Sequence, residues 1–266
     1  MEDKKPLVSI ITPSYNQGGF IEETVKSVLS QDYPNIEYIV VDGGSTDNTL
    51  NILKKYEGRL KWVSEKDRGQ ADAIAKGFRM SKGEILAWLN SDDTYLPGAV
   101  SDAVGCLTRR REVGLVYGQA YYVDGDGERM ARYPAGPTDH RGLRRGVTTI
   151  PQQATFFRSR VWRMVGPLDP SFYYAMDYDL WVRISALTPI AFVERPWANF
   201  RIHDLSKSRR EASRCWPEMM RVHFRDGGGR LSVLYAKYLV RRIVEPIMPW
   251  RLTLRKWRFA REHRRA

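Results

Sequence analysis

The sequence is poor in the features that mark membrane-spanning and disulfide-stabilised proteins. Only two cysteines occur, Cys106 and Cys215, and their separation matches neither a metal site nor a disulfide framework. No apolar run approaches the roughly 18 residues that cross a bilayer. The charged start of the chain also lacks the apolar stretch of a signal peptide. These absences predict a reduced, cytoplasmic protein.

The chain has fewer acidic than basic residues, and the imbalance lies in its last quarter. The chain has 266 residues and a net charge of +12. Residues 201–266 hold 18 Lys and Arg against 6 Asp and Glu, so they account for the whole excess. A neutral body with a basic tail indicates that the tail meets something anionic, whether lipid headgroups, nucleic acid or an acidic partner.

Apolar runs alternate with helical patterns through the first 120 residues. Helices are expected over about 20–29, 48–56 and 70–80, with Asp47 as an N-cap and Pro97 opening a further helix. The expected strands are 7–12, 36–41, 60–63, 84–89 and 113–117. This alternation predicts an α/β fold with a Rossmann-like, mostly parallel central sheet flanked by helices.

The pattern changes in the second half of the chain. A hairpin is expected at 121–133, strands near 155–157, 190–194 and 197–202, and a helix over 179–187. From about residue 208 the chain reads as helical and basic, with Pro246 and Pro249 ending one helix. Trp250 and Trp257 then share a face surrounded by arginines, as in interfacial helices. We expect residues 231–266 to contact an anionic membrane surface, with packing on the body or on a second copy of the chain as alternatives.

Short polar clusters follow four successive predicted strands. They span residues 12–16, 42–47, 65–70 and 90–93. Because ligands of parallel α/β sheets bind beyond the carboxyl ends of the strands, these clusters are expected to converge on one rim.

The residue types in these clusters suit a nucleoside diphosphate. Tyr15 can stack on a base, Asp42 can accept the imide N–H of a uracil or thymine, and Arg68 can pair with a diphosphate oxygen. Asp92 and Asp93 offer the hard oxygen ligands that Mg²⁺ or Mn²⁺ prefers. Simpler roles remain open: Asp42 and Asp93 can cap turns, and Arg68 can pair with a neighbouring carboxylate.

Four ordered motifs within residues 7–206 resemble glycosyltransferase family 2, which has the GT-A fold. They are VSIITPSYNQGGFIEETVKSVLSQDYPNIEYIVVDGGSTDNTL, WLNSDDTYLPG, YYAMDYDLWVR and RIHDLSKS. The resemblance implies an inverting transfer with Asp177 as general base and a divalent metal (Mn²⁺ or Mg²⁺) on Asp92 and His203. It implies nucleotide contacts from Pro13, Tyr15, Asn16, Asp42, Arg68, Asn90 and Ser91. Sugar, acceptor or diphosphate contacts would come from Asp93, Gln152, Gln153, Arg201 and Ser206.

Two positions depart from the family pattern. Asn90 stands where many members have the first Asp of an Asp-x-Asp motif, so Asp92 becomes the main metal ligand. Met176 stands where many members have a Glu before the catalytic Asp. The Gln-x-x-Arg-Trp motif of processive polysaccharide synthases is missing.

The resemblance therefore predicts a catalytic domain over 1–206 and a basic helical tail over 207–266. The catalytic domain divides into a nucleotide-binding half at about 1–118 and an acceptor-side half at about 119–206. The expected reaction moves a sugar from a UDP-sugar to a hydroxyl of a lipid-linked or surface-polysaccharide glycan, at the inner face of the cell membrane. The alternatives are a module that binds nucleic acid or another anionic partner through its tail, and an inactive GT-A scaffold. No recognised nucleic-acid motif occurs, so nucleic acid is not expected as a partner.

Overall fold

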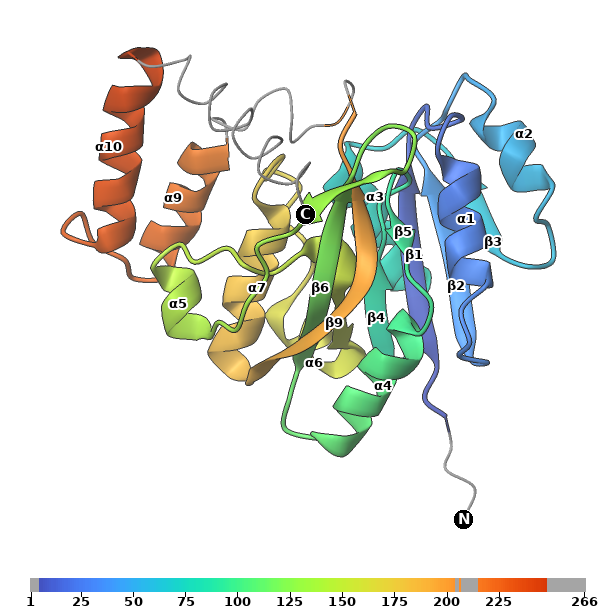
Figure 1. The fold of residues 1–266 in the computed structure, drawn as a ribbon, viewed down its shortest axis with the longest axis horizontal. Helices are drawn as coiled ribbons and strands as arrows, with labels where there is room; N and C mark the ends of the chain where they lie inside the picture. The colour runs from blue at the N-terminus through green and yellow to red at the C-terminus, as the bar shows by residue number, and fades with distance from the viewer. Residues whose placement is uncertain (1–4, 204–205, 207–214, 248–266) are drawn as a thin grey trace.

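A mixed β-sheet forms the centre of the molecule, with helices on both faces (Figure 1). The computed structural model describes residues 5–203, 206 and 215–247. In this part of the chain nine strands form one sheet in the order β3-β2-β1-β4-β8-β6-β9-β5, with β7 paired to β6. The predicted face at Trp250 and Trp257 lies outside the described residues.

The N-terminal half of the sheet is parallel, as the alternating pattern predicted. Its strands are β3 (Lys61–Ser64), β2 (Ile36–Asp42), β1 (Val8–Ser14) and β4 (Ile85–Trp88). Ser14 pairs in register with Asp42, and Asp42 pairs with Ser64. The carboxyl ends of three neighbouring strands therefore lie level with one another, which brings their polar clusters to one rim.

Two apolar cores separate the sheet from its helices. One core lies under α1 (Ile21–Leu29), α2 (Thr49–Lys54) and α4 (Ala99–Arg109). The other lies under α3 (Gln70–Met80), α6 (Ser159–Val165) and α7 (Met176–Leu187). Strand residues alternate between the two cores, as Ile10 and Ile11 of β1 do, because successive side chains point to opposite faces.

Two helix starts differ from the sequence prediction. The residue before α2 is Asn48, and the Asp47 carboxylate accepts from the backbone N–H groups of Thr49 at 3.0 Å and Gly18 at 2.8 Å. Asp47 thus ties the β1–α1 loop to the start of α2. Helix α4 begins at Ala99, because Gly98 is left-handed (φ 81°) and stops the helix from starting at Pro97.

The C-terminal half of the sheet is built from fewer, longer strands than predicted. Strand β6 (Leu115–Val123) joins two predicted strands and pairs with β7 (Arg129–Arg132) as the expected hairpin. Strand β9 (Ile190–Arg201) likewise joins two predicted strands and runs parallel to β6. The remaining elements of this half are β5 (Thr94–Tyr95), α5 (His140–Arg144), the short 3-10 helix η1 (Gln152–Ala154) and β8 (Thr155–Arg158).

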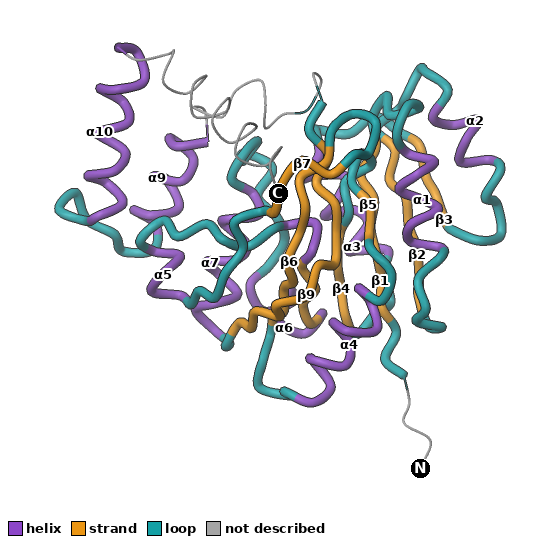
Figure 2. The backbone as a smooth tube through the Cα atoms, viewed as in Figure 1, coloured by secondary structure: helices purple, strands orange, loops and turns teal. Residues whose placement is uncertain are grey.

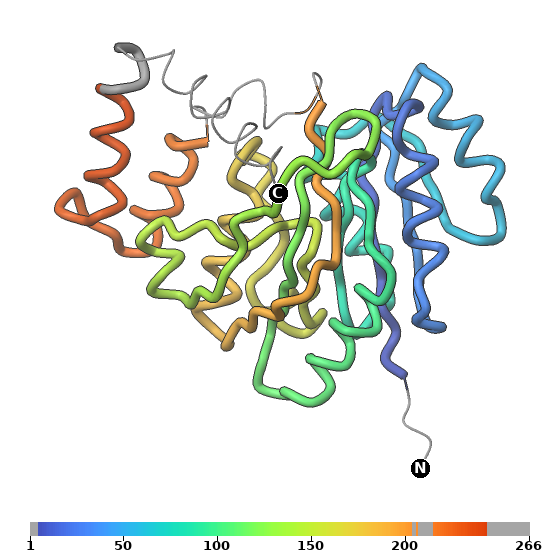
Figure 3. Tube along the Cα trace, viewed as in Figure 1, coloured from blue at the N-terminus to red at the C-terminus, as the bar shows by residue number. Residues whose placement is uncertain are grey.

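The last two described helices lie at one end of the molecule (Figures 2 and 3). Helix α9 (Cys215–Arg225) packs on α7, where Met219 and Val222 join the second core. Helix α10 (Val233–Ile247) reaches one residue past Pro246, the first of the two prolines expected to end it. None of the described helices is long and apolar enough to cross a bilayer.

Candidate active site

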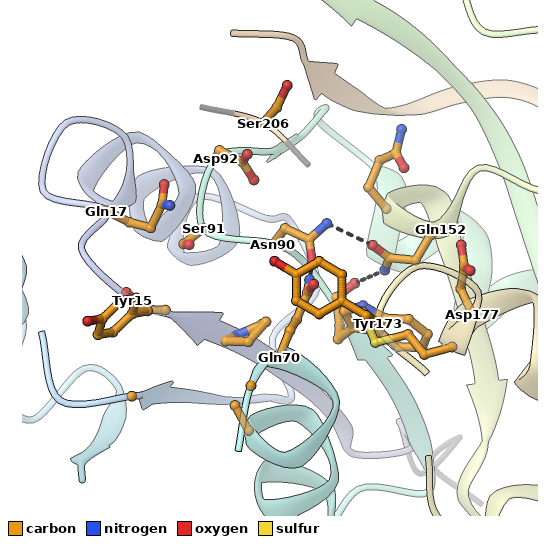
Figure 4. Close-up of a pocket in the computed structure, with 18 of the residues that line it drawn as sticks. Tyr15, Gln17, Gln70, Asn90, Ser91, Asp92, Gln152, Tyr173, Asp177 and Ser206 are labelled. Atoms are coloured by element: carbon orange, nitrogen blue, oxygen red, sulfur yellow. Dashed lines mark hydrogen bonds between the residues drawn. The ribbon is translucent and has the colours of Figure 1, made fainter. Parts of the chain in front are cut away.

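A cavity of about 790 Å³ opens at the rim where the parallel strands end. Ten of the predicted site residues line it: Pro13, Tyr15, Asn90, Ser91, Asp92, Gln152, Gln153, Asp177, His203 and Ser206. Tyr15 and Asp177 lie at opposite sides of the close-up, with Asn90 and Tyr173 between them (Figure 4). Five predicted residues do not line it: Asn16, Asp42, Arg68, Asp93 and Arg201.

Tyr15 is presented to solvent by the turn that follows β1. Its side chain is 59% exposed, which suits a ring that stacks on a ligand. Asn16 beside it has a positive φ of 51°, and its side-chain oxygen accepts from the backbone N–H of Thr46 at 2.9 Å. Asn16 therefore holds the turn, and Tyr15 and Pro13 face the cavity.

The Asp42 carboxylate is buried and does not line the cavity. One of its oxygens accepts from the N–H groups of Gly44 and Ser45 and from the Ser64 hydroxyl, at 2.7–3.0 Å. The other accepts from the Ser45 hydroxyl. These four bonds fix the loop after β2, so the structure corrects the expected position of Asp42 and favours its turn-holding role.

A different carboxylate, Asp67, lines the cavity beside this loop. One of its oxygens accepts from the N–H of Gly69 at 2.8 Å. The other lies 2.7 Å from the point where a Cβ would stand on Gly43, so only glycine leaves room for this carboxylate. Asp67 belongs to the expected 65–70 cluster, where it was considered only as one of the carboxylates that could pair with Arg68.

Arg68 does not line the cavity. Its guanidinium is exposed and pairs with Asp72 one helical turn later, at 3.3 Å. This pairing holds the pKa of the Asp72 carboxyl below its usual value. The basic side chain that lines the cavity at this strand end is Lys66.

Asn90 is the centre of a hydrogen-bonded group on the cavity floor. Its amide oxygen accepts from Gln70 at 2.7 Å, and its NH₂ group donates to Gln152 at 3.1 Å and to Asp93 at 3.2 Å. Gln152 in turn donates to the Trp88 carbonyl at 2.7 Å (Figure 4). A carboxylate at position 90 cannot donate to Asp93, which gives the departure from the family pattern a physical reason.

Asp92 and His203 both line the cavity, and their side chains lie next to each other. The His203 Nε2 and an Asp92 carboxylate oxygen are 3.1 Å apart. His203 also packs on the Phe20 ring, with the centroids 4.4 Å apart. Among the described residues no group of three His, Cys, Asp or Glu side chains gathers as a metal cage. A cation at this pair would therefore draw its remaining ligands from the substrate or from water, as Mg²⁺ and Mn²⁺ sites on nucleotides do.

Asp93 and Arg201 hold the loop over residues 90–93 from its buried side. Asp93 is buried and accepts from the backbone N–H of Arg201 at 2.9 Å. Burial and the neighbouring Asp92 charge raise the pKa of Asp93 well above its usual value. The Arg201 side chain is 2% exposed, donates to the Asp92 and Gly125 carbonyls at 2.9 Å, and pairs with Glu23. These partners occupy the guanidinium that was expected to bind phosphate.

Asp177 stands in the first turn of α7, on the opposite wall from Tyr15. One carboxylate oxygen accepts from the N–H of Tyr178 at 2.7 Å. Burial raises the pKa of Asp177 to about 6, and the charge of Glu218 adds to the shift. A carboxylate with this pKa is ionised at neutral pH yet basic enough to take a proton from a reacting hydroxyl.

Several lining residues were not predicted from the sequence. Besides Lys66 and Asp67 they include Gln70, Tyr133, Tyr173, Tyr174 and Met176. Gln70 belongs to a cluster at a predicted strand end, so its position was readable. Tyr133 and Tyr173 come from segments whose place depends on the tertiary fold, and no local pattern marks them.

The family model described as Glycosyl transferase family 2 matches residues 9–166. The chain is 32% identical over 241 residues to an uncharacterized glycosyltransferase of Mycobacterium tuberculosis, covering 87% of this chain and 90% of that protein. It is 28% identical over 201 residues to chondroitin synthase of Escherichia coli, covering 74% of this chain but 29% of the synthase. The chain spans about a third to two thirds of the length of several uncharacterized glycosyltransferases of Rickettsia that it matches at 28–30% identity.

Solved structures with the same fold include TarS of S. aureus, residues 1–349, in complex with UDP-GlcNAc. It matches with a TM-score of 0.68 and 19% identity, over 90% of this chain and 73% of that one. The mannosyltransferase PcManGT from Pyrobaculum calidifontis, in complex with GDP-Man and Mn²⁺, matches with a TM-score of 0.63 and 21% identity, over 89% and 70%. These likenesses show the fold.

Proposed function

Since the chain belongs to glycosyl transferase family 2, we propose that it moves a sugar from a uridine diphosphate sugar to an acceptor hydroxyl with inversion at the anomeric carbon. The observation that carries this proposal is the placement of Asp177. The Asp177 carboxylate, whose pKa is raised, stands on one wall of the cavity. Other parts of the cavity are lined by Tyr15 and Asp67, whose side chains suit a nucleotide base, and by the Asp92–His203 pair.

Asp177 is the general base in this mechanism. Its carboxylate takes the proton of the acceptor hydroxyl as the hydroxyl oxygen attacks the anomeric carbon. The bond from that carbon to the diphosphate oxygen breaks, and its electron pair leaves with the diphosphate. Attack and departure occur on opposite faces of the sugar, which inverts the configuration in a single displacement.

Asp92 and His203 are the residues that would hold a divalent cation. The oxygen and nitrogen donors of this pair suit Mn²⁺, and a site of one carboxylate plus substrate phosphates suits Mg²⁺. When bound, such a cation neutralises the charge that develops on the leaving diphosphate. Lys66 is placed at the cavity to contribute positive charge beside it.

Recognition of the base is assigned to Tyr15 and Asp67. The exposed Tyr15 ring offers a stacking surface, and the Asp67 oxygen beside Gly43 offers an acceptor for the imide N–H of uracil. Guanine also presents N–H donors to a carboxylate. The bound UDP-GlcNAc of TarS supports uridine as the first candidate.

The acceptor is proposed to be a lipid-linked or surface-polysaccharide glycan met at the inner face of the membrane. The support is the last described helix: α10 exposes Val233, Leu239, Val240 and Ile243 beside the basic Lys237 and Arg242. Apolar and basic side chains on one helix are the composition of an interfacial helix.

The decisive experiment measures nucleotide release across a panel of UDP-, GDP-, CDP- and TDP-sugars with Mn²⁺, with EDTA and without enzyme. We expect turnover of a UDP-sugar, loss of that turnover in EDTA, and recovery with Mn²⁺ or Mg²⁺. Asp177→Asn should bind the donor within a few-fold of the wild type yet lose at least about 1,000-fold in kcat, in line with removal of a general base and its charge. A wild-type protein that turns over none of these donors would favour the inactive-scaffold alternative. Normal activity in Asp177→Asn would show that Asp177 is not the general base.

A further inference from the structure

One carboxylate outside the cavity, Glu218 of α9, is bonded to the loop that leads into the catalytic helix. It accepts from the backbone N–H of Tyr173 at 3.0 Å and from those of Tyr174 and Ala175 at 2.8 Å. Three consecutive amides that point at one carboxylate form an anion-binding arrangement, here filled by a side chain of the same protein. Tyr173 and Tyr174 line the cavity, and Asp177 follows two residues after Ala175.

Other side chains on the same face of α9 reach the same segment. Arg221 donates to the Ser171 hydroxyl at 2.7 Å and lies over the Phe172 ring at 4.5 Å. Arg225 pairs with the buried Asp179 carboxylate of α7. Positions 218, 221 and 225 follow at three- and four-residue steps, so one helix face binds residues 171–179 throughout.

We infer that Glu218 is a positioning residue for the transfer reaction, which holds the 173–177 loop in its reactive shape and supplies negative charge beside the catalytic base. The inference deepens the proposed function and rests on it. It also assigns α9 to the active site, although residues 207–266 were expected to form a basic helical tail separate from the catalytic domain. The matched family region ends at residue 166, before this helix.

Glu218 is the acceptor for three backbone N–H groups in succession, of which those of Tyr174 and Ala175 form part-buried bonds. Buried backbone N–H groups need acceptors. Without Glu218 these amides must find water or new partners, and the loop must change shape to reach them. A shift of about 1 Å in a reacting group costs on the order of 100-fold in rate, so a loop two residues from Asp177 has direct leverage on kcat.

The titratable groups that face Asp177 are Tyr133 after β7, and Cys215 and Glu218 of α9. Burial raises the pKa of the Cys215 thiol to about 12 and that of Tyr133 still further, so both stay neutral at the pH of catalysis. Glu218 is therefore the group among the three that carries charge, and its charge raises the pKa of Asp177. Neutralising it should shift the acid limb of the rate profile to lower pH.

The test compares Glu218→Ala and Glu218→Gln with the control Glu194→Gln, an exposed residue of β9 with the same change in charge. Hydrogen exchange of peptides covering residues 171–178 should be faster by about tenfold or more in Glu218→Ala and by less in Glu218→Gln, which keeps one acceptor oxygen. In Glu218→Ala, kcat should fall by roughly 10- to 100-fold, while the KM for the donor stays within a few-fold of the wild-type value. Glu194→Gln should match the wild type in both measurements.

The pH profile separates positioning near the base from general stability. In Glu218→Gln the acid limb should lie at lower pH than in the wild type, while Glu194→Gln leaves it in place, because the Glu218 charge raises the pKa of Asp177. Wild-type exchange and kinetics in both Glu218 variants, or an unmoved acid limb in Glu218→Gln, would overturn the inference. If Glu218→Ala does not fold, Glu218→Gln alone decides. A wild-type protein without turnover would refute the proposed function, and the exchange data would still test the loop contact.

Discussion

Single residues in this site have roles that their neighbours determine. Asp42 and Asp67 both follow strands of the parallel sheet, and either carboxylate can accept an imide N–H. The structure distinguishes them by their bonding, because Asp42 already accepts four hydrogen bonds from its own loop and Ser64, whereas Asp67 lines the cavity with one oxygen beside Gly43. The sequence could place both in the site but could not show which one was already bonded.

The role of Asp67 can be tested through base preference. We expect Asp67→Asn to weaken UDP binding by about 10- to 100-fold, the range for a lost hydrogen bond to a charged group. CDP should lose less, because cytosine lacks the imide proton and an asparagine NH₂ can donate to its ring nitrogen. Isothermal titration with UDP and CDP measures both constants.

The matched variants sharpen that measurement. Gly43→Ala places a methyl group 2.7 Å from the Asp67 oxygen and should reproduce the binding defect. Asp42→Asn should instead lower thermal stability, because its buried loop loses a charged acceptor. Equal losses of UDP and CDP affinity in Asp67→Asn would argue against base recognition by this residue.

At the scale of whole elements, local pattern was a good guide where contacts are local. The parallel strands β1 to β4 and helix α3 follow from apolar periodicity and strand-end clusters, and the structure confirms them. The pattern failed where tertiary contacts override it, as in β6 and β9, which were each expected as two shorter strands. The shorter strands were expected to stop at residues 117 and 194, but these places mark an irregular register between two continuous strands.

Gly118 lies at this irregular register and against a buried aromatic ring, which gives a stability prediction. A Cβ on Gly118 would stand 2.4 Å from the Trp197 ring, and Trp197 is fully buried against Phe156. Since the ring has no room to move, Gly118→Ala should destabilise the fold by about 3 kcal/mol, at the upper part of the usual cost of overpacking. Urea unfolding measures this loss, with Gly136→Ala as the control because nothing lies within 4 Å of its Cβ position. Equal midpoints for the two variants would show that the strands can part at little cost.

At the scale of the molecule, the basic C-terminal segment divides into parts with different surroundings. Helix α9 lies next to α7 (Figure 1) and is built into the body through the second core and its bonds to the 171–179 segment. Helix α10 contacts the body through Leu234, which is buried, and leaves much of its apolar surface exposed. Net charge and helical periodicity predicted a basic helical region but not this division, because both helices are amphipathic and only tertiary packing shows which apolar face is covered.

The exposed face of α10 is where membrane contact can be tested without disturbing the core. We expect Val240→Ser with Ile243→Ser to weaken binding to vesicles of phosphatidylglycerol and phosphatidylcholine by about tenfold or more, since each buried aliphatic side chain contributes roughly 1.5–3 kcal/mol. Removal of residues 248–266, which hold seven Lys and Arg against one Glu, should reduce binding further and most strongly at low salt. Met164→Ser with Leu187→Ser is the control, because these exposed apolar side chains lie on α6 and α7. Unchanged vesicle sedimentation in the α10 variant would contradict membrane contact there, and a dimer that the same variant dissociates in light scattering would assign the face to a second copy of the chain.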